Sequence, residues 1–458
     1  MRTELKAAVC AVVLAAGSAG AVELAEDGRG QVVLLPFVEV NGNSRSELLV
    51  RNASATEGKA VRVVARDPVN GRPTASLNLY LGPLDAWRAT IEADPIRLAQ
   101  EVNVARLVLP EDRSCTRPAR AELADGAVLF TDASFSENFA ASDPGNRLAT
   151  ASLEIIEMGT VDAALATDCG AIAARWADDG VWSADPEADV SAPTGGLEAS
   201  INIVGNFPAR SFRYRGVALA DFRDAALHTD AGALSPHLGD VSPAVSSVFD
   251  TIQLAQRRVR LERKSTWASY PINAVNAVLL AAAAEGEFVS NRNERDSREP
   301  SGVAGAVLTF PTRAFHVDDF YLDASVGIQP GPFAGSAALA PAVTDLDGRA
   351  YSLGVPSGLE SCDSARASVT QVSLADTAFF SSTCDLQTAV FFVAGPPSEG
   401  RVRFDFAGEI VSDEGDVFRG QPVLPILFQS LVEPGVPPVR IATSGWSEYM
   451  SVQRAEIE

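Results

Sequence analysis

The 458-residue sequence predicts a mostly β protein, built from antiparallel β-sandwich domains of the immunoglobulin-like class with one or two short helices and long loops. Three observations lead to this fold class. Apolar and polar residues alternate with a period of two in many short runs, which is typical of half-buried strands. Turn-forming residues separate these runs at short intervals, as they do in sandwiches. The helices of about 10–15 residues that would alternate with strands in an α/β fold are missing.

The predicted strands are expected to be amphipathic, with one side against a core and the other side toward water. In the run 61–66, for example, Val61 and Val63 are expected to face the core and Arg62 to face water. The same alternation occurs in five runs in all: 61–66, 75–81, 152–155, 200–203 and 401–406.

Three segments rich in Gly, Asn, Asp or Pro are predicted to be the turns between strands. They are Asn41-Gly42-Asn43 between strands near 31–40 and 45–52, Pro68-Val69-Asn70-Gly71 between 60–66 and 75–81, and Asp413-Glu414-Gly415-Asp416 between 401–411 and 417–428. Helix is expected in two places only. The first is 161–176, interrupted near Cys169-Gly170, and the second is 272–285, with Gly286 at its C-terminal end.

The order of these elements suggests the domain organisation. Polar, Gly- and Pro-rich residues 177–197 are predicted to be a connector between domains. The resulting division is a signal peptide (1–21), an N-terminal β-sandwich domain (22–176), the connector (177–197), a middle β-rich region with the helix near 272–285 (198–325) and a C-terminal β-rich region (326–458).

The first 21 residues are predicted to be a cleaved secretory signal peptide, because a positive start is followed by a short apolar run and then by small residues. Cleavage is expected after Ala19 or Ala21, with Ala21 favoured. An uncleaved anchor is the alternative, but the apolar run is shorter than the about 20 residues that span a bilayer. The protein is therefore expected in the periplasm, at the cell surface or outside the cell, with no membrane span in the mature chain.

Four cysteines follow the predicted signal peptide: Cys115, Cys169, Cys362 and Cys384. An even number in an exported chain predicts two disulfides, and three connectivities are open. Pairing of sequence neighbours, Cys115 with Cys169 and Cys362 with Cys384, is favoured. A zinc site is the competing interpretation, but no pair has C-x-x-C spacing and no His lies nearby in the sequence.

Composition narrows the classes of partner and cofactor. The chain has 37 Lys and Arg against 59 Asp and Glu, a formal charge of −22, and is therefore predicted not to bind nucleic acid. No cofactor is expected, because the glycine motifs for phosphates and dinucleotides are absent from the sequence.

Residues 345–348 (DLDG) begin like a calcium loop, but Pro356 stands where such a loop needs Glu, so a turn is predicted. A looser calcium site in several acidic loops stays open, without named residues.

Candidate catalytic residues are few, and none is assigned. His228, His237 and His316 are the available bases for nucleophilic catalysis, and each is predicted to be a loop or structural residue. Carboxylate pairs such as Asp178-Asp179 and Asp318-Asp319 suit glycoside hydrolysis only when two acids flank one bond, and solvated positions are equally expected.

Two tryptophans receive opposite predictions. Trp87 continues an alternating run with Ala89 and Ile91 and is expected to be buried. Trp182 lies in the polar segment 177–197 and is the best candidate for an exposed aromatic side chain that contacts a ligand.

Four stretches are distinctive when taken together: VLLPF at 33–37, NLYLGPLDAW at 78–87, LEIIEMG at 153–159 and TFPTRAF at 309–315. This set resembles a family of exported, largely uncharacterised proteobacterial proteins, some of which are labelled surface-layer or cell-surface proteins. The resemblance extends in order from about residue 30 to about residue 400. It implies a secreted β-rich protein and supplies no catalytic residues.

The sequence therefore predicts an exported, non-enzymatic structural or interaction protein of the bacterial cell surface or periplasm. Exposed sheet edges would allow it to self-associate or to bind another envelope component. A carbohydrate- or ligand-binding β-sandwich protein is the alternative, and a carboxylate-dependent hydrolase has less support.

Overall fold

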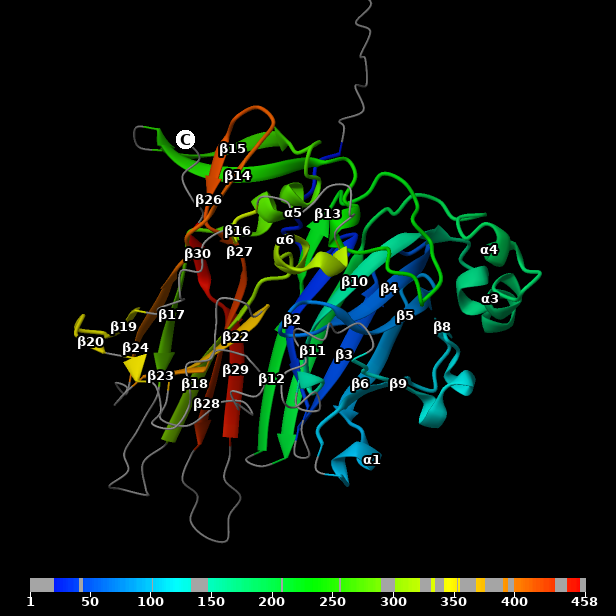
Figure 1. Cartoon of the computed structure of the whole chain (residues 1–458), viewed down its shortest axis with the longest axis horizontal. Coiled ribbons are helices and arrows are strands. Elements are labelled where there is room, and N and C mark those ends of the chain that lie inside the picture. The colour runs from blue at the N-terminus through cyan, green and yellow to red at the C-terminus, as the bar shows by residue number, and fades with distance from the viewer. Residues whose placement is uncertain are drawn as a thin grey trace, which may run out of the picture.

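The computed structural model describes residues 20–40, 44–100, 102–132, 147–206, 209–254, 257–289, 301–321, 331–333, 342–351, 353–354, 368–374, 390–393, 399–432 and 443–453. The predicted fold class is confirmed. The described part is mostly β, with several antiparallel sheets and a few short helices, and the sheets stack in pairs (Figure 1). Most of the predicted signal peptide, the turn 41–43 and the cysteines Cys362 and Cys384 lie outside the described residues.

The N-terminal sandwich consists of two large sheets that enclose a common core. In spatial order, the seven-stranded sheet contains β1 (Glu23–Leu24), β13 (Val217–Ala220), β2 (Val32–Glu39), β10 (Thr150–Val161), β4 (Gly58–Arg66), β5 (Pro73–Leu81) and β8 (Cys115–Arg117). The six-stranded sheet contains β12 (Ala209–Arg215), β11 (Leu197–Asn206), β3 (Ser44–Asn52), β6 (Ala86–Ala93), β7 (Ala105–Val108) and β9 (Ala127–Leu129).

Alternating apolar residues of both sheets form the core between them. Val61 and Val63 of β4 meet Leu48 and Trp87 of the opposite sheet in one hydrophobic cluster, and Trp87 is fully buried, as predicted. The predicted turn 68–71 is also confirmed, because β4 and β5 pair antiparallel across it. Burying these side chains is the dominant favourable contribution to this half of the fold.

A second sandwich follows in the C-terminal half (Figure 1). One sheet contains β20 (Ala350–Tyr351), β19 (Ala342–Asp345), β24 (Glu399–Asp405), β17 (Ala283–Val289) and β30 (Ser451–Gln453). The other contains β21 (Leu353–Gly354), β23 (Val390–Val393), β22 (Val369–Ser373), β18 (Ser301–Thr309), β28 (Leu424–Val432) and β29 (Thr443–Tyr449). The predicted alternation in 401–406 is confirmed in β24, where Val402 and Phe404 are buried and Arg401 and Asp405 are exposed.

The two sandwiches share part of their cores. Phe428 of β28 packs against Phe37 of β2 at a ring-centroid distance of 5.9 Å and against Phe212 of β12 at 5.5 Å. A hydrogen bond of 2.8 Å from the Thr309 hydroxyl to the Pro36 carbonyl crosses the same junction. The described halves are therefore joined by apolar packing as well as by the chain.

Short helices and hairpins connect or flank the sheets. The helices are α1 (Pro95–Leu98), η1 (Arg120–Glu122), η2 (Ala124–Gly126), η4 (Leu165–Thr167), α3 (Cys169–Arg175), α4 (Val181–Ala184), η5 (Leu238–Asp240), α5 (Ile272–Leu279), α6 (Ala314–Val317) and η6 (Asp319–Tyr321). The two-stranded pairs are β14 (Val245–Leu254) with β15 (Arg257–Thr266), β16 (Leu280–Ala281) with β27 (Gln421–Pro422), and β25 (Glu409–Val411) with β26 (Val417–Arg419), which encloses the predicted turn 413–416.

The helix predicted over 272–285 is wrong in its C-terminal half. Helix α5 ends at Leu279, and residues 283–289 form strand β17, which pairs with β24 and β30. Gly286 lies within that strand rather than at a helix end. Alanine favours helix when a segment is judged alone, but pairing with two neighbouring strands outweighs this small preference.

The predicted connector 177–197 does not divide two domains. Strands β11 and β12, which follow it, complete the sheet of β3, while β13 pairs with β2 in the other sheet. Residues 177–190 instead include α4 and pack against the N-terminal sandwich through Trp182. The segment 161–176, predicted as an interrupted helix, contains two short helices, η4 and α3. Helix α3 begins at Cys169, and the carboxylate of Asp168 caps it by accepting a 2.9 Å hydrogen bond from the amide of Ala171.

Candidate functional site

Three segments of chain cover the outer face of the seven-stranded sheet, where the sequence predicted exposure to water. They are 162–195, 221–243 and 314–321, and each contacts polar side chains of β4, β5 or β10. Arg62 and Glu154 are 1% and 3% exposed. The prediction of half-buried strands is therefore wrong for β4 and β10, because period-two alternation does not reveal that a distant segment packs over the polar side.

Arg62 of β4 lies at the centre of this covered face. Its guanidinium donates hydrogen bonds to the carbonyl oxygens of Ala231, Asp230 and Ser235, the last at 3.1 Å, and to the Thr229 hydroxyl at 2.6 Å. Burial lowers the pKa of Arg62 to about 10, so the side chain stays charged at neutral pH. A buried cation thus orders the loop 229–235 through its backbone carbonyls.

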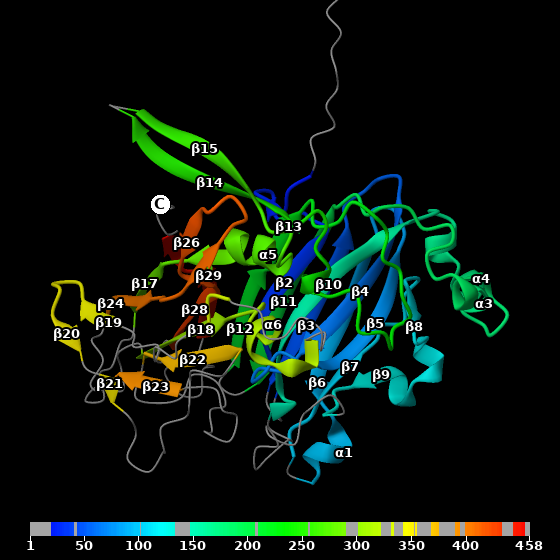
Figure 2. The same cartoon turned by 45° about the horizontal axis from the view of Figure 1, so that its top comes forward.

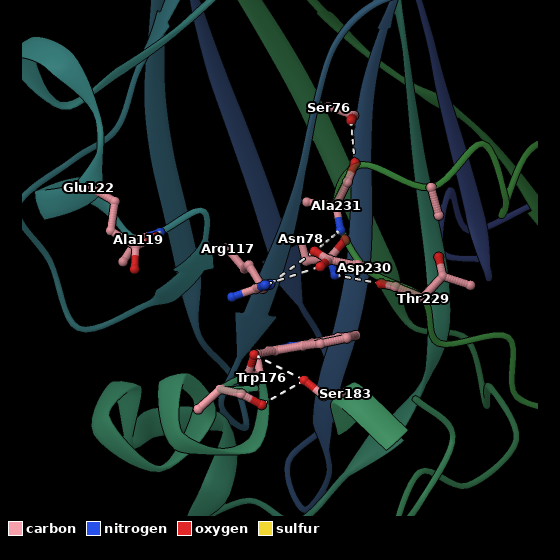
Figure 3. Close-up of polar contacts among 12 residues, drawn as sticks. Ser76, Asn78, Arg117, Ala119, Glu122, Trp176, Ser183, Thr229, Asp230 and Ala231 are labelled. Carbon is pink, nitrogen blue, oxygen red and sulfur yellow. Dashed lines mark hydrogen bonds and ion pairs between the residues drawn. The ribbon is translucent and has the colours of Figure 1, made fainter. Parts of the chain in front are cut away.

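The same loop is held by β5 and β8, as Figure 3 shows. Ser76 donates to the Ala231 carbonyl at 2.6 Å, and the Asn78 amide donates to the Thr229 carbonyl at 2.7 Å. Arg117 binds Asp230 with two hydrogen bonds, from Nε to Oδ1 at 2.9 Å and from Nη2 to Oδ2 at 3.0 Å. The hydrogen bond from Arg117 is the main reason that the pKa of Asp230 lies below its ordinary value.

An aromatic cluster lies next to this ion pair. Trp176 donates from Nε1 to the Tyr80 hydroxyl at 2.8 Å, and Tyr80 is 2.9 Å from Nε2 of His228. The other ring nitrogen of His228 faces the carbonyl of Pro186, an acceptor, so we assign the proton to Nδ1 and let Tyr80 donate to Nε2. Burial lowers the pKa of His228 to about 4, and the ring is therefore neutral at neutral pH.

Trp182 belongs to this cluster, and the prediction that it is exposed is wrong. Its side chain is fully buried, stacks on Tyr80 at a centroid distance of 5.7 Å with an interplanar angle of 7°, and donates from Nε1 to the Ala188 carbonyl at 2.8 Å. The polar segment around it is exposed, but the indole closes over the sheet because burying it stabilises the packing of α4.

A pocket of about 230 Å³ opens beside this layer. The Sγ atoms of Cys115 and Cys169, which line it, lie at the bonding distance predicted for this pair. Its wall also includes Arg117 and Trp176, with the guanidinium of Arg117 5.0 Å from the indole centroid. Trp87 contributes a buried Nε1–H that has no hydrogen-bond partner among the described residues.

The pocket combines aromatic surface with polar groups of both signs. Arg120 pairs with Glu111 at 2.9 Å, and the Asp112 carboxylate accepts from the amide of Ser114 at 2.9 Å. Partial burial raises the pKa of Asp112 above its ordinary value. Donors, acceptors and an indole in one small pocket can bind a small polyhydroxylated or zwitterionic molecule.

Buried ion pairs account for several other charged residues. Lys59 contacts Glu157 at 2.8 Å, with both side chains fully buried. Four further charged residues form two pairs at the edges of the covered face: Arg66 with Glu154 at 2.6 Å, and Arg72 with Asp318, where Nε donates to Oδ2 at 2.7 Å. These charges are neutralised by their partners, and removing one partner would leave the other charge buried and uncompensated.

The other two histidines lie in separate networks. Nδ1 of His237 accepts from the amide of Gly239 at 3.1 Å, and its ring packs on Phe315 at a centroid distance of 5.2 Å. Nε2 of His316 is 2.8 Å from the side-chain amide of Asn276. The structure therefore does not bring the three predicted histidines together.

The remaining predicted positions are surface features in the described part of the chain. Residues 345–348 form the predicted turn, in which the Gly348 amide donates to the Asp345 carbonyl at 3.0 Å. Asp178 and Asp179 are exposed. Within the described ranges, no group of three metal-binding side chains is present, and no helix is long and apolar enough to cross a membrane.

Sequence reasoning missed the Arg117–Asp230 pair, the Tyr80–His228 contact and the pocket beside Cys115. Loop 221–243, folded over β5 and β8, brings the two residue pairs together, and the packing of α3 beside residues 109–122 forms the pocket. The one available signal was the placement of Arg62, Asn78 and Tyr80 at regular positions on adjacent predicted strands. Comparisons with family models, curated proteins and solved structures found no match to this chain.

Proposed function

We propose that this chain is an exported interaction protein of the bacterial cell surface or periplasm and that the hairpin β14–β15 is its docking element. The single observation that carries the proposal is the geometry of this hairpin, called the arm below (residues 245–266). Its ten residue pairs run from Val245 with Thr266 to Leu254 with Arg257. In Figure 2 the arm projects away from both sandwiches.

The base of the arm is anchored, and its outer part pairs only with itself. Val22 bonds to β14 through its amide and its carbonyl, each at 2.8 Å, and the buried Trp267 donates from Nε1 to the Ser246 hydroxyl at 2.8 Å. The hairpin loop of β25 and β26 bonds to the base of β15, for example from the Asp413 amide to the Thr266 carbonyl at 3.0 Å. Beyond Phe249, the described backbone of β14 pairs with β15 alone.

Both long edges of such a ribbon offer unpaired backbone groups, which is the kind of surface that other chains bind by strand addition. Isolated two-stranded ribbons are only marginally stable in water. A partner that binds along the arm would stabilise its outer part, which pairs only with itself in the described structure. Export is supported by residues 1–21 and by the bonding distance between Cys115 and Cys169, since disulfides persist in oxidising compartments.

The test is a shortened arm. Residues 250–261 are replaced by Asn-Gly, which joins Phe249 to Glu262, a pair that faces each other in the register, by a two-residue hairpin turn. We expect the variant to keep the circular dichroism spectrum of the intact chain and to lose its retention in the envelope fraction of cells. An intact chain that stays in the cytoplasm with residues 1–21 attached would contradict export, and equal retention of the variant would contradict the role of the arm.

A second candidate function is binding of a small sugar-like molecule in the pocket beside Cys115. The unpaired Nε1–H of Trp87 favours it, because a buried donor without a partner carries a cost that a ligand oxygen would remove. Titration calorimetry with a panel of monosaccharides tests it. The Trp87→Phe variant keeps an aromatic ring and removes the donor, so we expect about a fivefold to tenfold loss of affinity. No heat with any sugar would remove this candidate.

A further inference from the structure

The arm carries a local excess of positive charge in this acidic chain. The chain as a whole carries a formal charge of −22, whereas residues 245–266 contain five basic and two acidic residues. All five basic residues belong to β15: Arg257, Arg258, Arg260, Arg263 and Lys264. The arm is therefore a local region of opposite sign, which the net charge of the sequence conceals.

The described basic side chains of the arm remain accessible. The side chains of Arg260 and Lys264 are 49% and 46% exposed, and Lys264 pairs with Glu262 of its own strand at 3.4 Å. Arg263, near the base of the arm, is 38% exposed and pairs with Asp416 at 3.3 Å. Arg260 pairs with Glu26, which is itself 70% exposed. Such exposed pairs contribute little free energy, so these cations can exchange their partners for a larger acidic surface.

A surface of the required sign is present on the same chain. Residues 162–189, called the acidic cap below, contain seven acidic residues and one basic residue, Arg175, which pairs with Asp189 at 3.0 Å. Asp178, Asp179 and Glu187 have no ion pair in the described part of the chain. All seven acidic residues are exposed: Asp162, Asp168, Asp178, Asp179, Asp185, Glu187 and Asp189.

The arm and the acidic cap lie on opposite sides of the molecule. In Figure 1, helices α3 and α4 of the cap lie at one end of the longest axis, and the arm extends toward the other end. Figure 2 shows the same separation from a second direction. An arm that projects away from the sandwiches cannot reach the cap of its own chain.

We infer that the arm of one molecule docks on the acidic cap of a second copy, so that the chain assembles head to tail. This inference rests on the proposed function and names the partner of its docking element. Each copy offers one arm and one cap, and these are two different surfaces. A contact of this kind is heterologous, and it propagates from copy to copy into a filament, or closes into a ring when the rotation allows.

Charge complementarity sets the salt dependence of the contact. Exposed charges attract at low ionic strength and are screened over about 10 Å at 0.1 M salt. We therefore expect assembly at about 0.05 M salt and at least a tenfold weaker association at about 0.5 M salt.

Charge reversal tests the inference on the full chain, with mass measured by light scattering after gel filtration. The arm variant is Arg260→Glu with Lys264→Glu, which changes the formal charge of the arm from +3 to −1. The cap variant combines Asp178→Lys, Asp179→Lys, Asp185→Lys and Glu187→Lys, which changes the formal charge of the acidic cap from −6 to +2. Each variant alone is expected to be monomeric at low salt, because arm and cap then carry the same sign. An equimolar mixture is expected to assemble again, since each reversed surface meets its complement on the other variant.

A matched control reverses two exposed arginines outside the arm, Arg88→Glu with Arg401→Glu, and is expected to assemble like the parent chain. Thermal unfolding of each variant checks that it is folded. A parent chain that is monomeric at low salt would overturn the inference, and so would an assembly that both reversals leave intact. If the parent chain is monomeric while the shortened arm still abolishes envelope retention, the partner is another envelope component and the proposed function stands without this inference.

Discussion

At the scale of single residues, Arg62 shows how strongly the fold depends on polar side chains that later segments cover. Its guanidinium donates to three backbone carbonyls: the hydrogen bond to Ala231 is buried, and those to Asp230 and Ser235 are partly buried. Leaving buried acceptors without a donor costs more than the hydrogen bonds themselves contribute. The packing of loop 229–235 therefore depends on one cation in β4.

Replacing this cation tests that dependence. Arg62→Met keeps the aliphatic part of the side chain and removes the guanidinium donor from three carbonyls. The carbonyl of Asp230 loses its Arg62 donor, while that of Ala231 keeps the Ser76 hydroxyl and that of Ser235 keeps the Thr229 hydroxyl. We expect a loss of about 2–4 kcal/mol in the free energy of unfolding, measured by urea denaturation. Arg88→Met, on the exposed face of β6, is the matched control and should change it by less than about 0.5 kcal/mol. Equal effects of the two variants would contradict the role of Arg62.

The buried His228 makes stability depend on pH. Burial lowers its pKa from the ordinary 6.5 to about 4, so the unfolded chain binds the proton more readily between these two values. Its contribution is fully present above pH 6.5 and is lost as the pH falls toward 4, by about 3 kcal/mol in total. Urea denaturation at a series of pH values is expected to show this slope, and His228→Gln to make it shallower. An unchanged slope in the variant would refute the assignment.

At the scale of elements, strand pairing decides where α5 ends. Residues 280–281 form β16, which pairs with β27, and β17 then continues along β24. Gly420, next to β27, has a φ of +123°, and a Cβ at this position would clash with the carbonyl of Ala281. The close approach of these two backbones thus requires glycine.

Two glycine substitutions separate this clash from backbone strain alone. Gly420→Ala should cost about 3 kcal/mol or more, because it adds both strain at positive φ and the collision with Ala281. Gly415→Ala also lies at positive φ, +94°, but meets no atom within 4 Å, and should cost only about 1 kcal/mol. The measurement is the free energy of unfolding of each variant. A smaller cost at Gly420 than at Gly415 would contradict the packing described here.

The elements also show what local patterns can predict. The turns 68–71 and 413–416 and the strand at 401–406 were predictable, since turn residues and period-two alternation act over a few neighbours. The end of α5 was not predictable, because it depends on the pairing of β17 with β24, more than a hundred positions away. The burial of Trp182 was not predictable either, because it depends on packing against Tyr80 of the sheet.

At the scale of the whole molecule, a shared core is expected to make the two sandwiches unfold together. Phe428 contacts rings of β2 and β12 from the other sandwich. We predict one thermal transition, coincident by circular dichroism and tryptophan fluorescence. Phe428→Ala should destabilise the chain by about 3–5 kcal/mol and shift that single transition. Two separate transitions in the parent chain would show that the halves fold independently.

The sequence alone was enough to predict the mostly β class, the positions of several strands and of the turns 68–71 and 413–416, the burial of Trp87 and the proximity of Cys115 to Cys169. These properties follow from apolar periodicity, turn chemistry and spacing along the chain. Only the tertiary structure decided what covers the polar side of β4, where the aromatic cluster closes over Tyr80, and that the basic strand β15 stands apart from an acidic body. The physical reason is that burial of a polar face and separation of charge arise between segments that are remote in sequence, and a local pattern carries no information on which segments meet.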